Sequence, residues 1–186
     1  MKARAPFHNH IVAAVLLLFL GLGPGFAQTA ALDDLFARLK EADAAAAGRI
    51  ERQIWSEWSK SGSPAMDLLL QRGRDAMAAG KTDEAIEHFT ALTDHAPDFA
   101  EGWNARATAY FQAGLYGPSV ADIARTLVLN PRHFGALSGL GTIYEQIDNP
   151  EKALQVYRAA LAIHPQLTGV LSSVERLEKA VKGTDL

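Results

Sequence analysis

Residues 134–165 read FGALSGLGTIYEQIDNPEKALQVYRAALAIHP, which is the clearest helix-turn-helix pattern in the chain. Counting from Leu137, apolar or small residues recur at i, i+3, i+4 and i+7, the spacing of one helix face. Asn149 and Pro150 then supply a capping side chain and a proline suited to the first turn of a second helix. That second helix has its own apolar stripe and ends before the closing proline, because proline removes a backbone donor and disfavours helix in the preceding residue. The stretch therefore predicts a helical hairpin.

The hairpin pattern recurs along the chain with a period of 34 residues, as Pro97, Pro131 and Pro165 show. The same step relates other positions: Trp103 to Leu137, Tyr110 to Tyr144, and, at twice the interval, Ala85 to Ala153. Small residues share the eighth column (Gly73, Ala107, Gly141) and large ones the twenty-fourth (Phe89, Ile123, Tyr157). Small side chains allow two helices to approach closely, and large ones fill the space between them. This period predicts stacked hairpins.

The repeated columns resemble those of the tetratricopeptide repeat (TPR) family over about 100 residues, from Met66 to Gln166, in three copies without insertions. The resemblance implies an all-α fold, a right-handed α-solenoid of TPR hairpins that presents a binding surface. The expected organisation is a signal peptide (1–27), a degenerate N-terminal hairpin (28–63), three repeats (66–99, 100–133 and 134–166), and a C-terminal capping helix with its tail (167–186).

Both ends of the array have amphipathic sequence that could cover it. Apolar residues between Leu167 and Val181 fall on one helical face, which predicts the capping helix. On the other side, Trp55 and Trp58 fall in the twenty-fourth and twenty-seventh columns of a fourth, degenerate copy, although Glu51 stands where a small residue is expected. The alternative is a single long helix over residues 32–59. In both readings the three tryptophans, Trp103 included, are expected to pack inside the protein.

The first 27 residues have the pattern of a secretory signal peptide. Lys2 and Arg4 precede a wholly apolar stretch over residues 11–20, and the pattern predicts cleavage after Ala27. We therefore expect an exported bacterial protein of the periplasm, with full secretion or an uncleaved N-terminal anchor as alternatives. Removing the leader leaves 16 basic and 21 acidic residues, a net charge of −5 that argues against nucleic acid as a partner.

No group of residues predicts catalysis, a cofactor or a metal. The chain has no cysteine, which excludes disulfides, thiol chemistry and cysteine-bound zinc. His95, His133 and His164 lie beside the repeat-closing prolines, so we expect solvated turn histidines without a chemical role. His88 has no second histidine four residues on, so it predicts no metal site. Arg72 and Arg106 share a column and are expected to reach along the array.

The family resemblance implies that the first helix of each repeat lines a concave groove. The candidate partner-binding residues occupy the second, fifth, ninth, twelfth and thirteenth columns: Asp67, Leu70, Arg74, Met77, Glu101, Asn104, Thr108, Phe111, Gln112, Ser138, Thr142, Glu145 and Gln146. TPR domains that hold chaperone C-termini use lysine, asparagine and arginine as a carboxylate clamp. Here Leu70, Arg74, Gly135 and Gly139 stand at clamp positions, which argues against a chaperone tail as ligand. The two glycines either thin the helix or let a bound segment approach.

The mixture of apolar, amide and charged groove residues favours an extended peptide or a partner helix. We therefore predict a non-enzymatic adaptor of the bacterial envelope that holds a segment of a partner protein and assists complex assembly. The alternative is a structural protein that forms a homo-oligomer through Trp55, Trp58 and the N-terminal hairpin.

Overall fold

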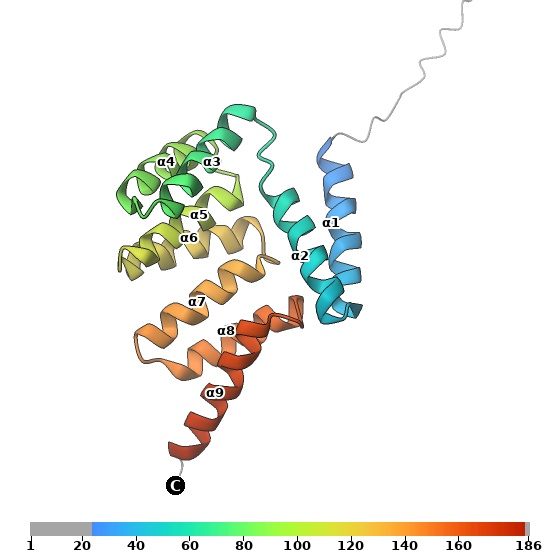
Figure 1. Ribbon diagram of the computed structural model, residues 1–186, viewed down its shortest axis with the longest axis vertical. Coiled ribbons are helices and arrows are strands. Elements are labelled where there is room, and N and C mark those ends of the chain that lie inside the picture. The colour runs from blue at the N-terminus through green and yellow to red at the C-terminus, as the bar shows by residue number, and fades with distance from the viewer. Residues whose placement is uncertain (1–23, 185–186) are drawn as a thin grey trace, which may run out of the picture.

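The computed structural model describes residues 24–184, and in this part of the chain the regular structure is entirely helical. The helices are α1 (Pro24–Glu41), α2 (Ala44–Trp58), α3 (Pro64–Ala78), α4 (Thr82–His95), α5 (Ala100–Gln112), α6 (Tyr116–Leu129), α7 (Phe134–Gln146), α8 (Pro150–Ile163) and α9 (Thr168–Thr184). Helices α3 to α9 form an all-α solenoid of stacked hairpins (Figure 1), as predicted. The pairs α5/α6 and α7/α8 fall within the second and third expected repeats, and α3/α4 occupies the first, with α3 beginning at Pro64, just before the expected start at residue 66.

The eighth and twenty-fourth columns meet inside each hairpin, as their sizes predicted. A Cβ added to Gly73 would lie 2.2 Å from the ring of Phe89, and one added to Gly141 would lie 2.4 Å from the ring of Tyr157. Both rings are buried. The absence of a side chain at these glycines is therefore what lets the second helix place an aromatic ring against the first.

The turn inside each hairpin has one residue in the left-handed backbone region, again at the 34-residue step. Gly80, Gly114 and Asp148 have φ angles of 72°, 73° and 56°. The residue after each donates its backbone N–H to a carbonyl five residues earlier, as in the bond from Asn149 to Tyr144. This geometry closes the C-terminus of the first helix and favours glycine, so Asp148 carries a steric cost that the other two avoid.

Helix α9 covers the C-terminal end of the array, which confirms the predicted capping helix. Val170 and Leu177 of α9 are buried against Ala153, Leu154 and Tyr157 of α8. Arg158 of α8 forms an ion pair with Glu178 of α9 at 2.6 Å. The apolar face of the last repeat is thereby removed from water.

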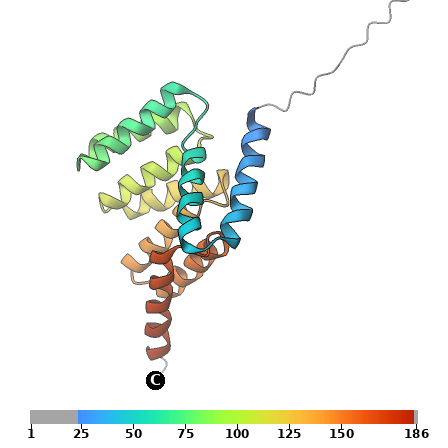
Figure 2. The ribbon, with the colours of Figure 1, turned by 45° about the vertical axis from the view of Figure 1, so that its right-hand side comes forward.

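The N-terminal segment forms two helices, α1 and α2, so the hairpin is confirmed and the single long helix is wrong. It does not stack on the first repeat, however, and our expectation that it covers that end is wrong. Its core instead includes Phe134, which begins α7, together with Ile163 and Leu167. Figures 1 and 2 show α1 and α2 side by side at the edge of the stack.

The outer face of the first repeat explains why no cover is needed there. Exposed Arg72, Asp75 and Glu84 and half-buried His88 line the hollow between α3 and α4 on that side. In the second repeat the column of Asp75 holds Ala109, which is buried against the preceding hairpin. Polar residues in packing columns therefore let the first hairpin end the array in water.

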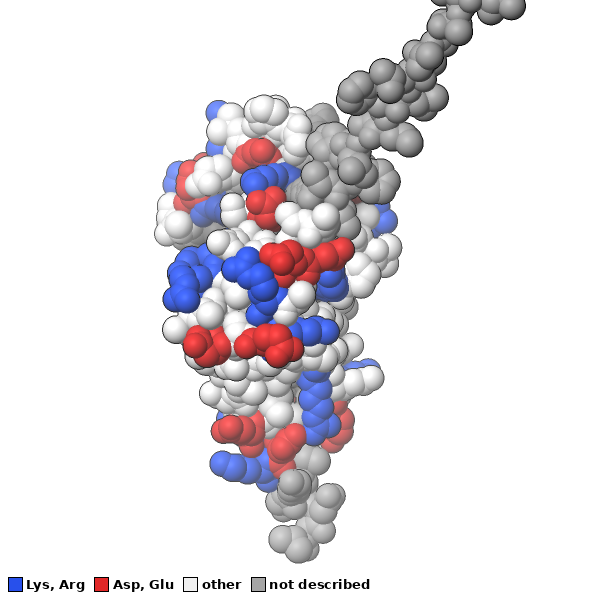
Figure 3. Space-filling model, turned by 90° about the vertical axis from the view of Figure 1, so that its right-hand side faces the viewer, with Lys and Arg blue, Asp and Glu red and all other residues white. Residues whose placement is uncertain are grey.

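The surface beside α1 and α2 carries acidic and basic side chains in alternation rather than a patch of one sign (Figure 3). Arg132, in the turn before α7, pairs with Asp33 of α1 at 2.7 Å and lies over the ring of Phe36.

The predicted leader falls largely on residues 1–23, outside the described residues, and α1 includes the predicted cleavage position after Ala27. None of the described helices combines the length and apolarity that crossing a bilayer would require.

Candidate functional site

The first helices of the three repeats line two adjoining hollows. One, of about 410 Å³, lies between α5, α6 and α7 and has Phe111, Ile123 and Ile143 among its walls. The other lies between α3 and α5 and is reached by Arg74 and Met77. Asn104 and Thr108 border both hollows, so the two form one continuous groove across the repeats.

The structure brings together eight of the thirteen predicted groove residues in these hollows: Arg74, Met77, Glu101, Asn104, Thr108, Phe111, Gln112 and Thr142. Ser138 lines a separate hollow between α2, α7 and the start of α9. Asp67 accepts hydrogen bonds from Ser61, and Glu145 pairs with Arg176 of α9. Gln146 is exposed at the end of α7.

Two of the predicted groove residues are covered. Leu70 is 2% exposed and belongs to the core of the first repeat, and Glu101 is 3% exposed at the start of α5. Leu70 packs against α5 inside the protein, and the carboxylate of Glu101, although it borders the hollow between α3 and α5, is held by Arg74 and His133. The repeat positions therefore predict where the groove lies, but they do not show which of its side chains are buried by neighbouring helices.

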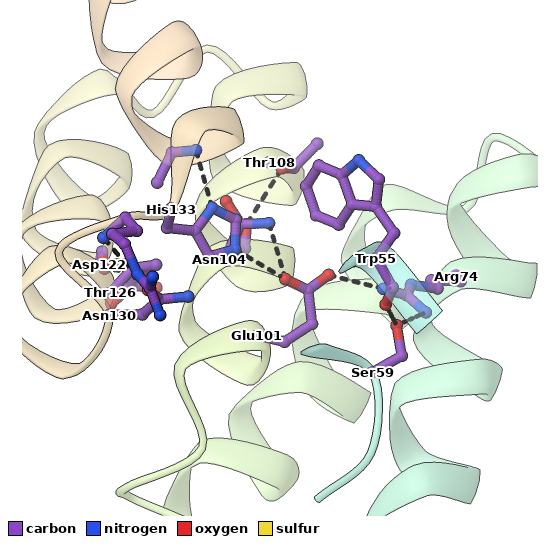
Figure 4. A network of polar contacts seen from close by, with 12 residues as sticks. Trp55, Ser59, Arg74, Glu101, Asn104, Thr108, Asp122, Thr126, Asn130 and His133 are labelled. Carbon is purple, nitrogen blue, oxygen red and sulfur yellow. Dashed lines mark hydrogen bonds and ion pairs between the residues drawn. The ribbon is translucent and has the colours of Figure 1, made fainter. Parts of the chain in front are cut away.

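Glu101 is the centre of a polar network that joins four helices (Figure 4). One carboxylate oxygen accepts from Arg74 of α3 at 2.6 Å. The other accepts from the amide of Asn104 at 3.2 Å and lies 3.0 Å from Nε2 of His133. Arg74 also donates to the hydroxyl of Ser59, at the end of α2, at 3.1 Å. This network connects the N-terminal hairpin to all three repeats.

His133 is fully buried, so our expectation of a solvated turn histidine is wrong. Its Nδ1 accepts from the backbone N–H of Ala136 at 3.0 Å and caps α7. Because Nδ1 is an acceptor, the proton of the neutral ring lies on Nε2 and is donated to Glu101. The ring also stacks on Trp58, with centroids 4.3 Å apart.

His164 has a similar arrangement in the next turn between hairpins, and our expectation that it is solvated is also wrong. It is buried, its Nδ1 accepts from the N–H of Gln166 at 3.3 Å, and its Nε2 faces Glu51 of α2 at 3.4 Å. Of the three histidines beside prolines, His95 is the exposed one. Glu51 did not fit its repeat column because it connects α2 to His164, at the end of α8.

Trp55 and Trp58 pack in a core as predicted, whereas Trp103 lies outside the cores, against Arg106 and Arg125. Trp58 is buried, whereas Trp55 and Trp103 are half-buried. Trp55 meets Phe134 edge to face and lies where a side chain on Gly135 would be, since a Cβ there would come within 2.6 Å of its ring. The close approach that Gly135 permits is thus made by the chain's own α2.

Arg106 reaches along the array as predicted. It makes two hydrogen bonds, of 2.7 and 2.9 Å, to the carboxylate of Asp122 in the same repeat and one of 2.9 Å to Thr93 in the preceding one. The hydrogen bond to Asp122 raises the pKa of Arg106. Arg72, its counterpart in the first repeat, is exposed.

Comparison with known proteins agrees with this geometry. Family models of the tetratricopeptide repeat match residues 70–118 and 136–181. A TPR repeat-containing protein of Rhizobium etli is 36% identical over 153 residues, which are 82% of this chain and 75% of that protein. The chain belongs to the tetratricopeptide repeat family. Its TPR region is also similar to Hsp70-Hsp90 organizing protein 1 of Glycine max, at 26% identity over 63% of this chain and 21% of that protein.

A solved TPR structure has the same fold. The first TPR of Spaghetti (RPAP3), bound to the HSP90 peptide SRMEEVD, superimposes with a TM-score of 0.60 at 24% identity and covers 63% of this chain and 93% of that one. At this identity the likeness is one of fold. Within the described residues, no three or more histidine, aspartate or glutamate side chains come together in a way that could hold a metal ion.

Proposed function

We propose that this TPR protein is a non-enzymatic adaptor that holds a segment of a partner protein in the groove of α3, α5 and α7. The observation that carries the proposal is the continuity of the two hollows through Asn104 and Thr108. A groove that crosses two repeat boundaries suits an extended segment, whereas a small molecule would be enclosed more fully.

Hydrogen bonds within the protein hold the helices of the groove together, which supports a binding role. The Glu101 network fixes α2, α3, α5 and α7 relative to one another. Arg106 does the same for α4, α5 and α6. Binding to a preorganised surface has a smaller ordering cost on the adaptor's side, so affinity can come from few contacts.

We place the adaptor in the bacterial envelope, where it would assist the assembly of a complex. The support is the leader pattern of residues 1–27. N-terminal sequencing of the protein from a periplasmic fraction tests this setting. A mature chain that begins at Gln28 is expected, and an intact leader on cytoplasmic protein would contradict it.

A photo-crosslinking amino acid placed in the groove tests the adaptor role in cells. Thr108 is exposed in the groove, and Val128, which is exposed on α6 and lines neither hollow, is the matched control position. Capture of one envelope protein from position 108 and not from position 128 is the expected result, with the partner identified by mass spectrometry. Equal capture from both positions would contradict a groove-based function.

Self-association is the competing function, and the same experiment distinguishes it. The tryptophans of the N-terminal hairpin that were expected to form the oligomer contact are used within the protein, because Trp58 is buried and Trp55 packs on Phe134 and Gly135. Crosslinks from position 108 that join only two copies of this chain, together with a concentration-dependent sedimentation coefficient, would favour the oligomer.

A further inference from the structure

From the chemistry of its groove, and resting on the function proposed above, we infer that this protein binds an internal, uncharged segment of its partner. That segment would supply main-chain N–H donors and one apolar side chain. A partner tail that ends in acidic residues and a free carboxylate would not fit. Three independent features of the groove support this choice: its charges, its hydrogen-bonding groups and its one unpacked glycine.

The charged side chains of the groove are compensated within the protein. Arg74, the cation that borders the hollows, is held by Glu101 at 2.6 Å and by Ser59. Glu145, on α7 outside both hollows, pairs with Arg176 and accepts from Tyr157. The guanidinium has further N–H groups, but Glu101 already neutralises its charge, so a partner carboxylate would find no uncompensated cation there and would lie near a buried carboxylate. The charge balance therefore favours an uncharged segment.

Three polar side chains of the groove floor already donate within the protein. One of the two amide N–H groups of Asn104 donates to Glu101, and its carbonyl oxygen is an acceptor. The hydroxyls of Thr108 and Thr142 donate to carbonyls one turn earlier in their own helices, at 3.0 and 3.1 Å. Oxygen atoms with their protons committed accept from a ligand, and main-chain N–H groups are the donors that an extended segment carries.

Gly139 leaves open space in the wall of the hollow between α5, α6 and α7. A Cβ added there would meet only Ile123, at an ordinary 3.8 Å, in contrast to the close contacts at Gly73, Gly135 and Gly141. Packing inside the protein therefore gives no reason for glycine, which destabilises a helix relative to alanine. The space between Gly139 and Phe111 fits an apolar anchor from the partner.

The inference is tested by selecting peptides on the purified full chain from two displayed libraries of random heptapeptides. One library embeds the peptide within a loop, and the other ends in a free carboxylate. We expect binders from the embedded library, enriched in one large aliphatic or aromatic position and depleted in aspartate and glutamate. Their affinity should be insensitive to salt, because no ion pair forms.

Two glycine variants connect this binding to the groove. Gly139→Leu should weaken the selected peptide by about ten-fold or more, because the leucine occupies the hollow. Gly117→Leu, on α6 with nothing within 4 Å of an added Cβ, is the matched control and should leave affinity unchanged. Circular dichroism confirms the fold of both variants.

The possible failures of the inference and of the proposed function differ. Binders that come mainly from the free-carboxylate library and are lost in Gly139→Leu would overturn the inference while the groove remained a binding site. If neither library gave peptides whose binding is weakened by Gly139→Leu, both the inference and the proposed function would be overturned.

Discussion

The contact between Gly73 and Phe89 allows a stability change to be derived from the structure. In Gly73→Ala the new methyl group would lie 2.2, 2.6 and 2.6 Å from three ring atoms of Phe89. Carbon atoms in contact prefer separations of about 3.5–4.0 Å, so the ring must move by about 1 Å or more. The ring is buried, so its movement displaces its neighbours as well.

Overpacking of this kind costs about 1–3 kcal/mol, and the gain in helix propensity from glycine to alanine offsets about 1 kcal/mol of it. Gly73→Ala should therefore lower the free energy of unfolding by about 1 kcal/mol, measured by urea denaturation followed by circular dichroism. Gly139→Ala is the control, because its methyl group has room, and it should raise stability by about 0.5–1 kcal/mol. If Gly73→Ala matched or exceeded the parent, the argument for close helix approach would be refuted.

Three further changes test other parts of the structure. Asp148→Gly should raise stability by about 1 kcal/mol in the same assay, because φ at this residue is 56°. Arg74→Met should lower the free energy of unfolding by about 3 kcal/mol, because it leaves the buried carboxylate of Glu101 without its cation. Glu101→Gln should lower it by less, because the arginine that it leaves unpaired is 38% exposed. Additive effects in the double variant would contradict this coupling. Burial raises the pKa of Tyr157 above its unfolded value near 10, so its contribution to stability is complete below about pH 10 and is lost as pH rises through the folded pKa. Tyr157→Phe should therefore reduce the loss of stability in alkaline urea titrations, and an unchanged loss would contradict the assignment.

The repeats could be predicted from the sequence because each hairpin uses the same columns for the same contacts. Gly73 with Phe89 and Gly141 with Tyr157 are one contact made twice, so periodicity alone reveals it. The capping helix was predictable for a related reason, since its apolar face must match the face that every repeat presents to the next.

The position of the N-terminal hairpin could not be predicted in this way, because its contacts cross repeats and have no period. Glu51 looked like a misfit in a repeat column, yet it faces His164 across the edge of the stack. His133 likewise looked like an ordinary turn residue, although it binds Glu101. Polar residues that misfit their columns were the available signal for these buried pairs, and the groove columns could not show that Glu101 would be enclosed.

The most direct test of the account combines the groove crosslink with the glycine variants. The crosslinker at position 108 would be introduced into Gly139→Leu and into Gly117→Leu, and the amount of captured partner compared in cells that express equal amounts of each protein. We expect the product to be lost in the first background and retained in the second. Equal capture in both would show that the hollow between α5 and α7 is not where the partner binds.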